Sequence, residues 1–279
     1  MHSDYESRGY LQEDFRLFHL KDTALHPVDW HYHNFHKIIF FRSGHVRYSI
    51  EGKTYTLQPG DLILVSQGCI HRPEVLDETP YERLILYISP AYLAALGGDS
   101  DLETCFRLSR EQYNFVLRPR NEDLSLQSLA GQLDKATQRP DFGQELLCRC
   151  LFLQLMICIN RRVLAGQLEY VSESVFDQKI VAVLQYLNLH LAEPLTVDFL
   201  ASQFYISKFH LMRKFKEATG YTIHNYLIKK RLLLAREQIL NGAAVLDACY
   251  HCGFQDYSAF SRAYKKQFGF SPRQTTLQL

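Results

Sequence analysis

A sixteen-residue pattern near the end of the chain occurs twice, and this repeat constrains the fold more than any other feature. The segment 207–222 recurs 49 positions later as the segment 256–271. Each copy begins with a residue type that caps helix N-termini, Ser207 or Asp256, and contains a glycine of the kind that stops helices, Gly220 or Gly269. A short basic helix that is used twice indicates a device that touches a repeating polymer at two places.

Length, charge and cysteine usage set the broad class. At 279 residues the chain is long enough for two domains. The segment 172–279 holds 13 Lys and Arg against 8 Asp and Glu, whereas the remainder holds 18 against 22. This asymmetry is compatible with nucleic-acid binding, and chance variation in surface charge explains it equally well. The sequence contains no apolar run of membrane-spanning length and no signal-peptide core, so we predict a cytoplasmic protein with no membrane partner. Its seven cysteines follow no framework spacing, which predicts reduced thiols.

The pattern along the chain predicts an α+β protein of two domains. Short runs rich in branched and aromatic residues predict β-strands, and their spacing indicates a sandwich or barrel. These runs are Phe15–Leu20, Lys37–Arg42, Val46–Ile50, Thr54–Leu57, Leu62–Val65 and Glu82–Ile88. Residues 90–166 predict helices, and the apolar helix Phe142–Asn160 packs either in its own core or against a second subunit of a homodimer. The domain boundaries follow as 1–166, a linker at 167–176, and 177–279.

The two repeated helices have the pattern of helix-turn-helix units. Leu211 and Phe215 are spaced i,i+4, so they share one face of the first helix and predict a buried contact. A different face of each helix carries polar, basic and exposed apolar residues. A shorter predicted helix precedes each copy. Two helices joined by a short turn, with the second exposing a basic face, indicate a helix-turn-helix.

The segment between the repeats predicts a helix of about 19 residues, close to 28 Å long at ~1.5 Å rise per residue. Such a connector can hold two helices in successive major grooves of B-DNA, which are ~34 Å apart. Arg213 and Arg262 are then placed to address guanine edges, and Phe209 and Met212 to touch thymine methyl groups. Tyr257 can reach a phosphate or a base. The lysines that suit phosphates are Lys208, Lys216, Lys265 and Lys266.

The segment from about Phe176 to Thr275 resembles the AraC/XylS family of bacterial transcription regulators. The residues that carry the resemblance are Arg231, Leu232, Ala235, Gly253, Phe254, Ser258, Phe260, Arg262, Tyr264, Lys265, Lys266, Phe268, Gly269, Ser271 and Pro272. The resemblance implies a C-terminal all-α domain with two helix-turn-helix units, and it places Phe209, Met212, Arg213, Tyr257, Ser258 and Arg262 where relatives contact bases. Two departures, Ala248-Cys249 and Gln274-Thr275-Thr276, are expected to affect packing.

The N-terminal stretch resembles the cupins, small double-stranded β-barrels. His31-x-His33 followed by Gly44, and Gly60 with Gly68 and His71, match the two cupin motifs. Lys37 or Ile38 stands where the acidic metal ligand is expected, and an ammonium group there opposes a cation. We therefore predict no metal, no cofactor and no catalytic residue. The predicted ligand pocket consists of Trp30, His31, His33, Lys37, Tyr48 and His71.

Together these features predict a transcription regulator, an activator, that binds double-stranded promoter DNA. The resemblance implies a small-molecule effector, such as a sugar, in the cupin-like barrel, a helical dimerisation segment, and RNA polymerase as a partner. Two alternatives remain open at this point. One is a metal-dependent cupin enzyme fused to a DNA-binding tail, and the other is a ligand-independent repressor.

Overall fold

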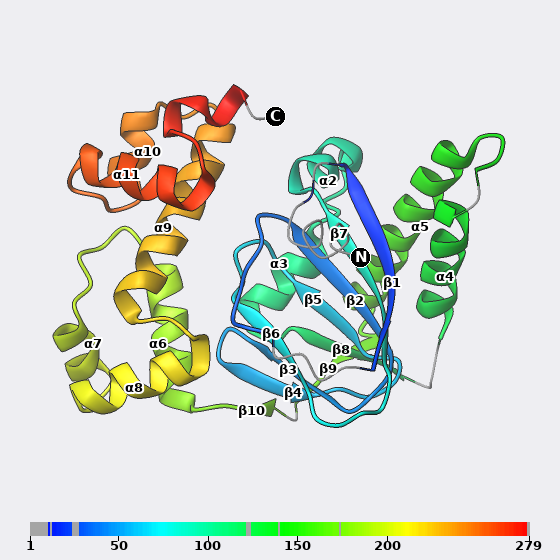
Figure 1. Cartoon of the computed structure of the whole chain (residues 1–279), viewed down its shortest axis with the longest axis horizontal. Helices are drawn as coiled ribbons and strands as arrows, with labels where there is room; N and C mark the ends of the chain where they lie inside the picture. The colour runs from blue at the N-terminus through cyan, green and yellow to red at the C-terminus, as the bar shows by residue number, and fades with distance from the viewer. Residues whose placement is uncertain are drawn as a thin grey trace. The chain divides into compact units, whose positions relative to one another are not determined.

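The computed structural model describes residues 11, 13–23, 28–120, 124–138, 140–172 and 174–277. The chain divides into one unit of Met1–Ile50 with Thr54–Val175, and a second of Phe176–Leu279 with Glu51–Lys53 (Figure 1). Among the described helices, none is both long enough and apolar enough to cross a membrane.

Two antiparallel sheets form the first unit. The larger has the strand order β1-β7-β2-β5-β8-β9, and the smaller has the order β10-β4-β3-β6. The predicted α+β class, with a β-rich N-terminal unit and a helical C-terminal unit, is confirmed. The strands are β1 (Phe15–Asp22), β2 (His36–Ser43), β3 (Val46–Ile50), β4 (Lys53–Thr56), β5 (Leu62–Val65), β6 (His71–Val75), β7 (Tyr81–Ile88), β8 (Val116–Pro119), β9 (Leu168–Tyr170) and β10 (Ser174–Val175).

Four of these strands lie where the sequence did not predict them. β6 contains Pro73, which has no N–H to donate, and the strand lies at the edge of its sheet, where a proline is tolerated. β8 interrupts the stretch that was predicted as helical. β9 pairs with β8, and β10 pairs with β4, so both occupy the segment 167–176 that was predicted as a linker. Each of β8, β9 and β10 is too short to show a period in the sequence.

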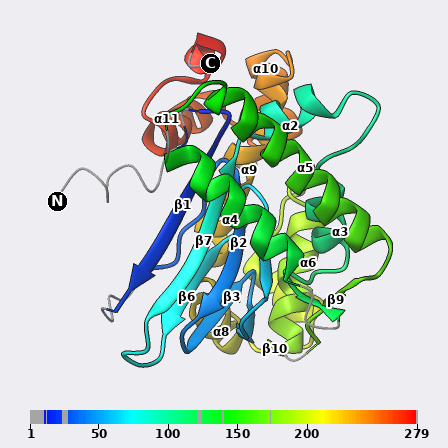
Figure 2. The ribbon, with the colours of Figure 1, turned by 90° about the vertical axis from the view of Figure 1, so that its right-hand side faces the viewer.

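The alternation of side chains along β2 and β7 explains where the core lies. Ile38, Phe40, Leu84 and Leu86 point to one face of the larger sheet and join a cluster with α4 (Ser125–Gln138) and α5 (Gln144–Leu164). Figure 2 shows these two helices running across that sheet. Because side chains alternate, Lys37 of β2 points to the other face, toward the smaller sheet.

Helix α5 buries one side of the predicted apolar helix Phe142–Asn160. Its buried residues recur at helical spacing and are Cys148, Phe152, Leu155, Met156, Ile159, Asn160 and Val163. Leu146 and Leu147, which also lie in the predicted apolar helix, are 68% and 52% exposed. The sequence could not tell the buried apolar positions from the exposed ones, because apolar residues occur on nearly all sides of α5. The first unit also contains α2 (Pro90–Gly97) and α3 (Thr104–Glu111).

Between residues 176 and 277 the second unit consists of helices joined by turns and loops. Its elements are α6 (Gln178–Leu189), α7 (Val197–Gln203), α8 (Lys208–Thr219), α9 (Ile223–Leu240), α10 (Val245–His251), α11 (Tyr257–Phe268) and the 3-10 helix η3 (Pro272–Leu277). The helix-turn-helix pairs are α7 with α8 and α10 with α11. We call them the first and the second helix-turn-helix.

Capping residues account for where α8 and α11 begin and end. These two helices, the second of each helix-turn-helix, are called the reading helices below. The Ser207 hydroxyl accepts from the His210 N–H at the start of α8, and the Asp256 carboxylate accepts from the Ala259 N–H at the start of α11. Both helices end at a left-handed glycine, Gly220 or Gly269. These caps confirm the element boundaries that the repeat predicted.

Each helix-turn-helix has its own core, and α9 contributes to both. Leu211 and Phe215 are fully buried, and Tyr226 of α9 meets Phe215 edge-on with 5.4 Å between ring centroids. In the second, Phe260 and Tyr264 pack with Leu232, Ala235 and Ile239 of α9. The Tyr264 hydroxyl also bonds to the Thr275 hydroxyl at 2.7 Å, so Thr275 is part of this core.

Arg231 of α9 binds backbone carbonyls of two separate segments. Its Nε donates to the Leu191 carbonyl at 2.6 Å and its Nη2 to the Glu193 carbonyl at 2.6 Å, both in the loop before α7. Its Nη1 donates to the Gly253 carbonyl at 3.1 Å, in the turn before α11. One guanidinium therefore fixes the loop before α7 and the turn of the second helix-turn-helix to α9.

Candidate DNA-reading face and histidine cluster

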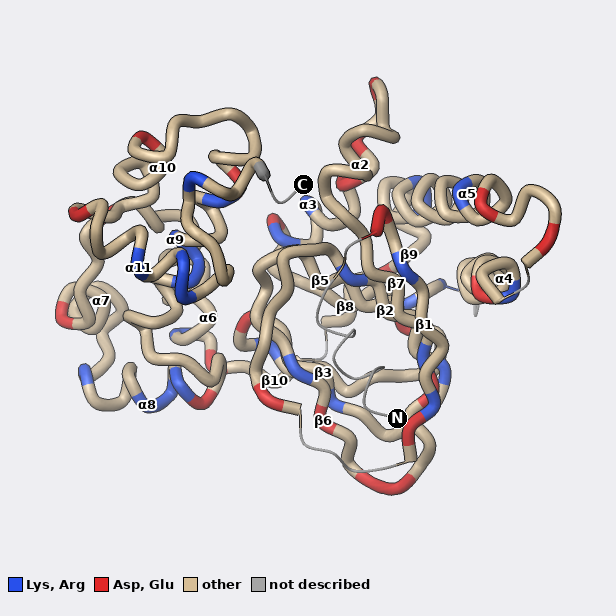
Figure 3. The backbone as a smooth tube through the Cα atoms, turned by 45° about the horizontal axis from the view of Figure 1, so that its top comes forward, with Lys and Arg blue, Asp and Glu red and all other residues tan. Residues whose placement is uncertain are grey.

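The outer face of α8 carries the residues that the sequence assigned to DNA. Phe209 is 74% exposed and Met212 is 43% exposed, which is unusual for large apolar side chains with no partner. Lys208, Arg213 and Lys216 are exposed on the same helix, whereas Leu211 and Phe215 are buried. Figure 3 shows the basic positions along α8 in blue. The structure therefore brings the five predicted α8 residues to solvent.

The outer face of α11 is exposed as well. Ser258, Arg262 and Lys265 are exposed. Tyr257, at the first position of the helix, is half-buried, with its ring 6.1 Å from that of Phe260. The Tyr257 ring packs against the core of the second helix-turn-helix.

Ion pairs distinguish the two faces. Arg213 pairs with Glu217 at 2.9 Å, one turn further along α8. Lys208 pairs with Asp198 of α7 at 2.8 Å. On α11, the position that corresponds to Glu217 is occupied by Lys266. Among the described residues, Arg262 has no carboxylate partner.

Glu217 is a residue of this face that the sequence reasoning missed. It accepts from Arg213 and from Lys214 at 2.9 Å each, and the bond from Lys214 is the largest cause that lowers the pKa of its carboxyl group. The i,i+4 spacing from Arg213 is the signal that could have found it. A carboxylate here holds the Arg213 guanidinium and adds a negative charge to a surface that would meet phosphates.

The predicted barrel residues gather between the two sheets of the first unit. One ring nitrogen from each of His31, His33 and His71 lies within 4.8 Å of the others. His31 and His71 are also joined by an antiparallel backbone bridge, with N···O distances of 3.1 and 2.9 Å. His71 is fully buried and lies at the start of β6, whereas His31 and His33 are half-buried.

Lys37 reaches this cluster from the larger sheet. Its Nζ lies 3.4 Å from His71 Nε2 and 5.6 Å from the ring centre of Tyr87, its cross-strand neighbour on β7. Burial, with the nearby Arg83 second, lowers the pKa of Lys37 to about 7. Burial also lowers the pKa of His71 and of His31 below their usual range, so both imidazoles are neutral at pH 7.

Tyr48 and Trp30 complete the predicted pocket in different ways. The Tyr48 ring is buried and lies parallel to that of His71, with 6.0 Å between centroids. The Trp30 ring has the Arg72 guanidinium over its face at 4.7 Å. Arg72, Arg83 and Tyr87 were not predicted, because they come from strands whose pairing decides which side chains meet.

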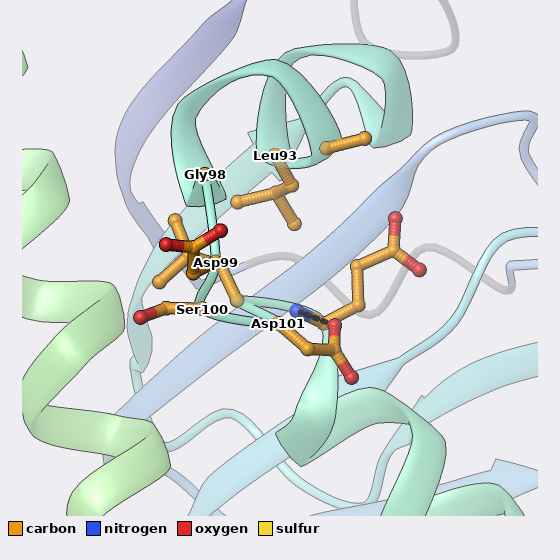
Figure 4. Close-up of a pocket in the computed structure, with 8 residues that line it drawn as sticks. Leu93, Gly98, Asp99, Ser100 and Asp101 are labelled. Carbon is orange, nitrogen blue, oxygen red and sulfur yellow. Dashed lines mark hydrogen bonds between the residues drawn. The ribbon is translucent and has the colours of Figure 1, made fainter.

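A cavity of about 270 Å³ lies elsewhere, beside the loop that joins α2 to α3 (Figure 4). None of the predicted ligand residues lines it. Asp101, one of its acidic residues, accepts from the Glu103 N–H at 2.9 Å and from the Thr104 hydroxyl at 3.0 Å. The carboxylate is thus bonded within the turn that leads into α3.

The fold and these two sites define a two-part protein, with a β-rich domain built around a polar cluster and a helical domain with two helix-turn-helix units. Comparison with known proteins finds the same two domains. Residues 18–156 match the family described as the AraC-like ligand binding domain, and residues 200–278 match a helix-turn-helix domain. Together the two matches extend over most of the chain.

Relatives match across both domains. The chain is 29% identical over 248 residues to the HTH-type transcriptional activator RhaS of Escherichia coli O157:H7, covering 87% of this chain and 85% of RhaS. RhaS of Escherichia coli O1:K1 matches to the same extent. The solved structure of ToxT from Vibrio cholerae covers 96% of this chain and 99% of ToxT, at 14% identity and a TM-score of 0.38. The chain belongs to the AraC family of transcription regulators.

Proposed function

We propose that this chain is a transcription activator that binds double-stranded promoter DNA in response to a small-molecule effector. The observation that carries the proposal is the pair of solvent-exposed reading helices, each capped and held on its own core. The relatives named above are transcriptional activators, which supports the activating role. RNA polymerase is the partner that an activator requires, and the cytoplasm is its place of action.

The base-reading residues of this proposal are Arg213 and Arg262, one on each reading helix. Exposed Phe209, Met212 and Ser258 lie on the same two helices, and Tyr257 lies at the start of α11. Lys208, Lys216 and Lys265 supply phosphate contacts, which add affinity without sequence choice. Because the two faces differ, the proposed binding site is an asymmetric DNA sequence.

Selected DNA tests the reading face. Fragments enriched from a random pool by the full chain would be labelled, and binding measured by fluorescence anisotropy over a range of salt concentrations. Arg213→Ala with Arg262→Ala should weaken binding to the enriched fragment by more than about tenfold, since each good arginine–guanine contact is worth about 1–3 kcal/mol. Lys135→Ala, an exposed change on α4, is the matched control. Equal binding by the double variant and the control would remove these residues from the proposal.

The effector of the proposal is a small polar molecule, of the sugar class, bound among His31, His33, Lys37, Tyr48 and His71. Neutral imidazoles and a buried lysine offer both acceptors and donors to hydroxyl groups. Trp30, capped by Arg72, belongs to the rim. A thermal-shift screen of sugars, followed by anisotropy on the enriched DNA, tests this part. A sugar that raises the melting temperature yet leaves DNA binding unchanged would contradict the regulatory role.

Dimerisation is a further part of the proposal, with a second copy of the chain on α5. Leu146 and Leu147 at its N-terminal end are exposed, and Cys150 continues that face one turn along. Light scattering should give twice the chain mass at micromolar concentration. Leu146→Glu with Leu147→Glu should give the monomer mass, and Gln154→Glu, also exposed on α5, should leave the dimer intact. We also propose that the chain has no catalytic activity.

A further inference from the structure

The turn of the first helix-turn-helix has a tyrosine where the second has a glycine. In the first turn the Ile206 N–H donates to the Ala201 carbonyl at 3.0 Å, and the second turn closes with the corresponding bond at 3.1 Å. The residue before the donor has a positive φ in each turn, 51° at Tyr205 and 85° at Gly253. Helices often end in this way, with a left-handed residue that is usually glycine, because glycine has no Cβ atom.

The fold does little to stabilise the Tyr205 side chain at this position. The side chain is 88% exposed. Within the described part of the chain its hydroxyl has no hydrogen-bond partner and its ring has no aromatic or cationic neighbour. A bulky residue in the left-handed region is strained, and strained residues cluster at functional sites. An exposed tyrosine that is kept at such a position indicates contact with a partner molecule.

The turn lies directly before the reading helix α8, which identifies the partner. Tyr205 is separated by one residue from Ser207, the N-cap of α8. The N-terminal residues of a recognition helix approach base edges in the major groove, so the segment just before them comes close to the phosphates that border the groove. Tyrosine hydroxyls are among the groups that donate to phosphate oxygens in protein–DNA complexes.

Lys179 of α6 binds the same turn and adds a positive charge to it. Its Nζ donates to the Tyr205 carbonyl at 2.7 Å. Helix α6 packs against α8 within the helical unit (Figure 1). Lys179 is exposed and has no carboxylate partner among the residues that the structure describes, whereas Lys208 pairs with Asp198. An ammonium group has three N–H donors, so donors remain for a phosphate after the carbonyl is bound.

The second helix-turn-helix has a cation at the corresponding carbonyl, but this cation is engaged inside the protein. Arg231 Nη1 donates to the Gly253 carbonyl at 3.1 Å, while the same guanidinium binds the Leu191 and Glu193 carbonyls. Arg231 is half-buried, and Gly253 has no side chain to offer. The two turns thus share their backbone bonds and differ in what they present to solvent.

We propose that Tyr205 and Lys179 form a phosphate-contact site beside the groove that α8 reads. The ligand is the phosphodiester backbone of DNA, and the site belongs to the first helix-turn-helix alone. This inference deepens the proposed function and rests on it, since it needs DNA bound at α8. Because phosphate contacts carry no sequence choice, the site adds affinity and fixes the orientation of the first helix-turn-helix on the duplex.

Removal of the tyrosine hydroxyl is the direct test. The full chain and Tyr205→Phe would be titrated, by fluorescence anisotropy, with the enriched DNA fragment and with a scrambled fragment of the same length. Tyr205→Phe should bind both about three- to tenfold more weakly, since one hydrogen bond is lost. The slope of log affinity against log salt should not change, because a neutral donor releases no counterion. Tyr92→Phe is the matched control, because the Tyr92 hydroxyl, on α2, has no hydrogen-bond partner among the described residues.

Lys179→Gln should differ from Tyr205→Phe in its salt dependence. Loss of one cationic phosphate contact should reduce the slope of log affinity against log salt by about one. Glutamine still has an N–H donor for the Tyr205 carbonyl, so the turn can keep its bond. Lys135→Gln, an exposed change on α4, is the matched control for charge. A slope for Lys179→Gln equal to that of Lys135→Gln would overturn the role of Lys179.

Tyr205→Gly separates a binding role from a structural one. Glycine relieves the left-handed strain, so this variant should resist urea as well as the parent chain or better, and yet bind DNA as weakly as Tyr205→Phe. Full DNA affinity in Tyr205→Phe, with the fold intact by circular dichroism, would overturn the proposal. If the Arg213→Ala and Arg262→Ala double variant then still loses affinity, the proposed function stands without this site. No DNA binding by the parent chain would overturn both.

Discussion

The two helix-turn-helix units share one architecture and differ in charge. Both reading helices begin at a capping side chain, bury an apolar pair spaced i,i+4 and end at a left-handed glycine. In the first helix-turn-helix two cations are paired with carboxylates, since Glu217 binds Arg213 and Asp198 binds Lys208. The second places Lys266 where the first has Glu217. The fold of a unit is therefore fixed by residues that face inward, while its contribution to DNA binding depends on a few outward positions.

The turn between the two helices also differs between the two helix-turn-helix units. A substitution in this turn should have the largest effect on the free energy of unfolding. Gly253 has a φ of 85°, and a Cβ atom there would lie 2.6 Å from the Ala192 carbonyl oxygen. Gly253→Ala should lower the free energy of unfolding by about 3 kcal/mol, from left-handed strain and the clash. In the first helix-turn-helix, Tyr205 has a φ of 51° in the turn between α7 and α8. Tyr205→Gly should be neutral or stabilising, and urea unfolding of both variants measures the contrast; equal losses would contradict it.

Arg231 gives the next largest effect, because it holds the loop before α7 and the turn of the second helix-turn-helix to α9. Arg231→Ala removes three hydrogen bonds from a charged donor and should destabilise the helical unit by about 2 kcal/mol. Arg231→Lys keeps the charge but cannot reach three carbonyls at once, so it should recover only part of the loss. Urea unfolding followed by circular dichroism measures both. Full recovery by lysine would show that charge, rather than the fork geometry, matters.

DNA binding should be more sensitive to Arg262 than to Arg213. Arg262→Ala should cost about 1.5 kcal/mol, roughly tenfold in affinity, on selected DNA. Arg213→Ala should cost less, because binding by the parent chain must first release Arg213 from Glu217. Anisotropy titrations of the two single variants at the same salt concentration measure the difference. A larger loss for Arg213→Ala would reverse the proposed ranking of the two faces.

The smallest effect is expected at Glu217. Glu217→Gln removes a negative charge from the reading face and frees Arg213, so affinity for DNA should rise several-fold. Lys266→Gln at the corresponding position of α11 should do the opposite, and it should reduce the slope of log affinity against log salt by about one. Anisotropy at several salt concentrations separates the two. Unchanged affinity in both variants would mean that these positions lie outside the DNA interface.

The sequence predicted the helical unit closely and the β-rich unit partly. The caps Ser207 and Asp256 and the buried pair Leu211 and Phe215 are local features, so they could be located from spacing and residue type. The strands β6, β8, β9 and β10 were missed because they are short or interrupted by Pro73. Their positions depend on partners far along the chain, which a local pattern does not contain.

The candidate sites divide in the same way. The sequence by itself determined which helix faces point outward, since an i,i+4 core pair fixes the orientation of the rest of the helix. Only the tertiary structure decided that Lys37 of β2 meets His71 of β6, and that Arg213 is held by Glu217 while Arg262 is not paired with any described carboxylate. The physical reason is that helix geometry repeats within a few residues, whereas strand pairing and side-chain bonding join residues through folded space.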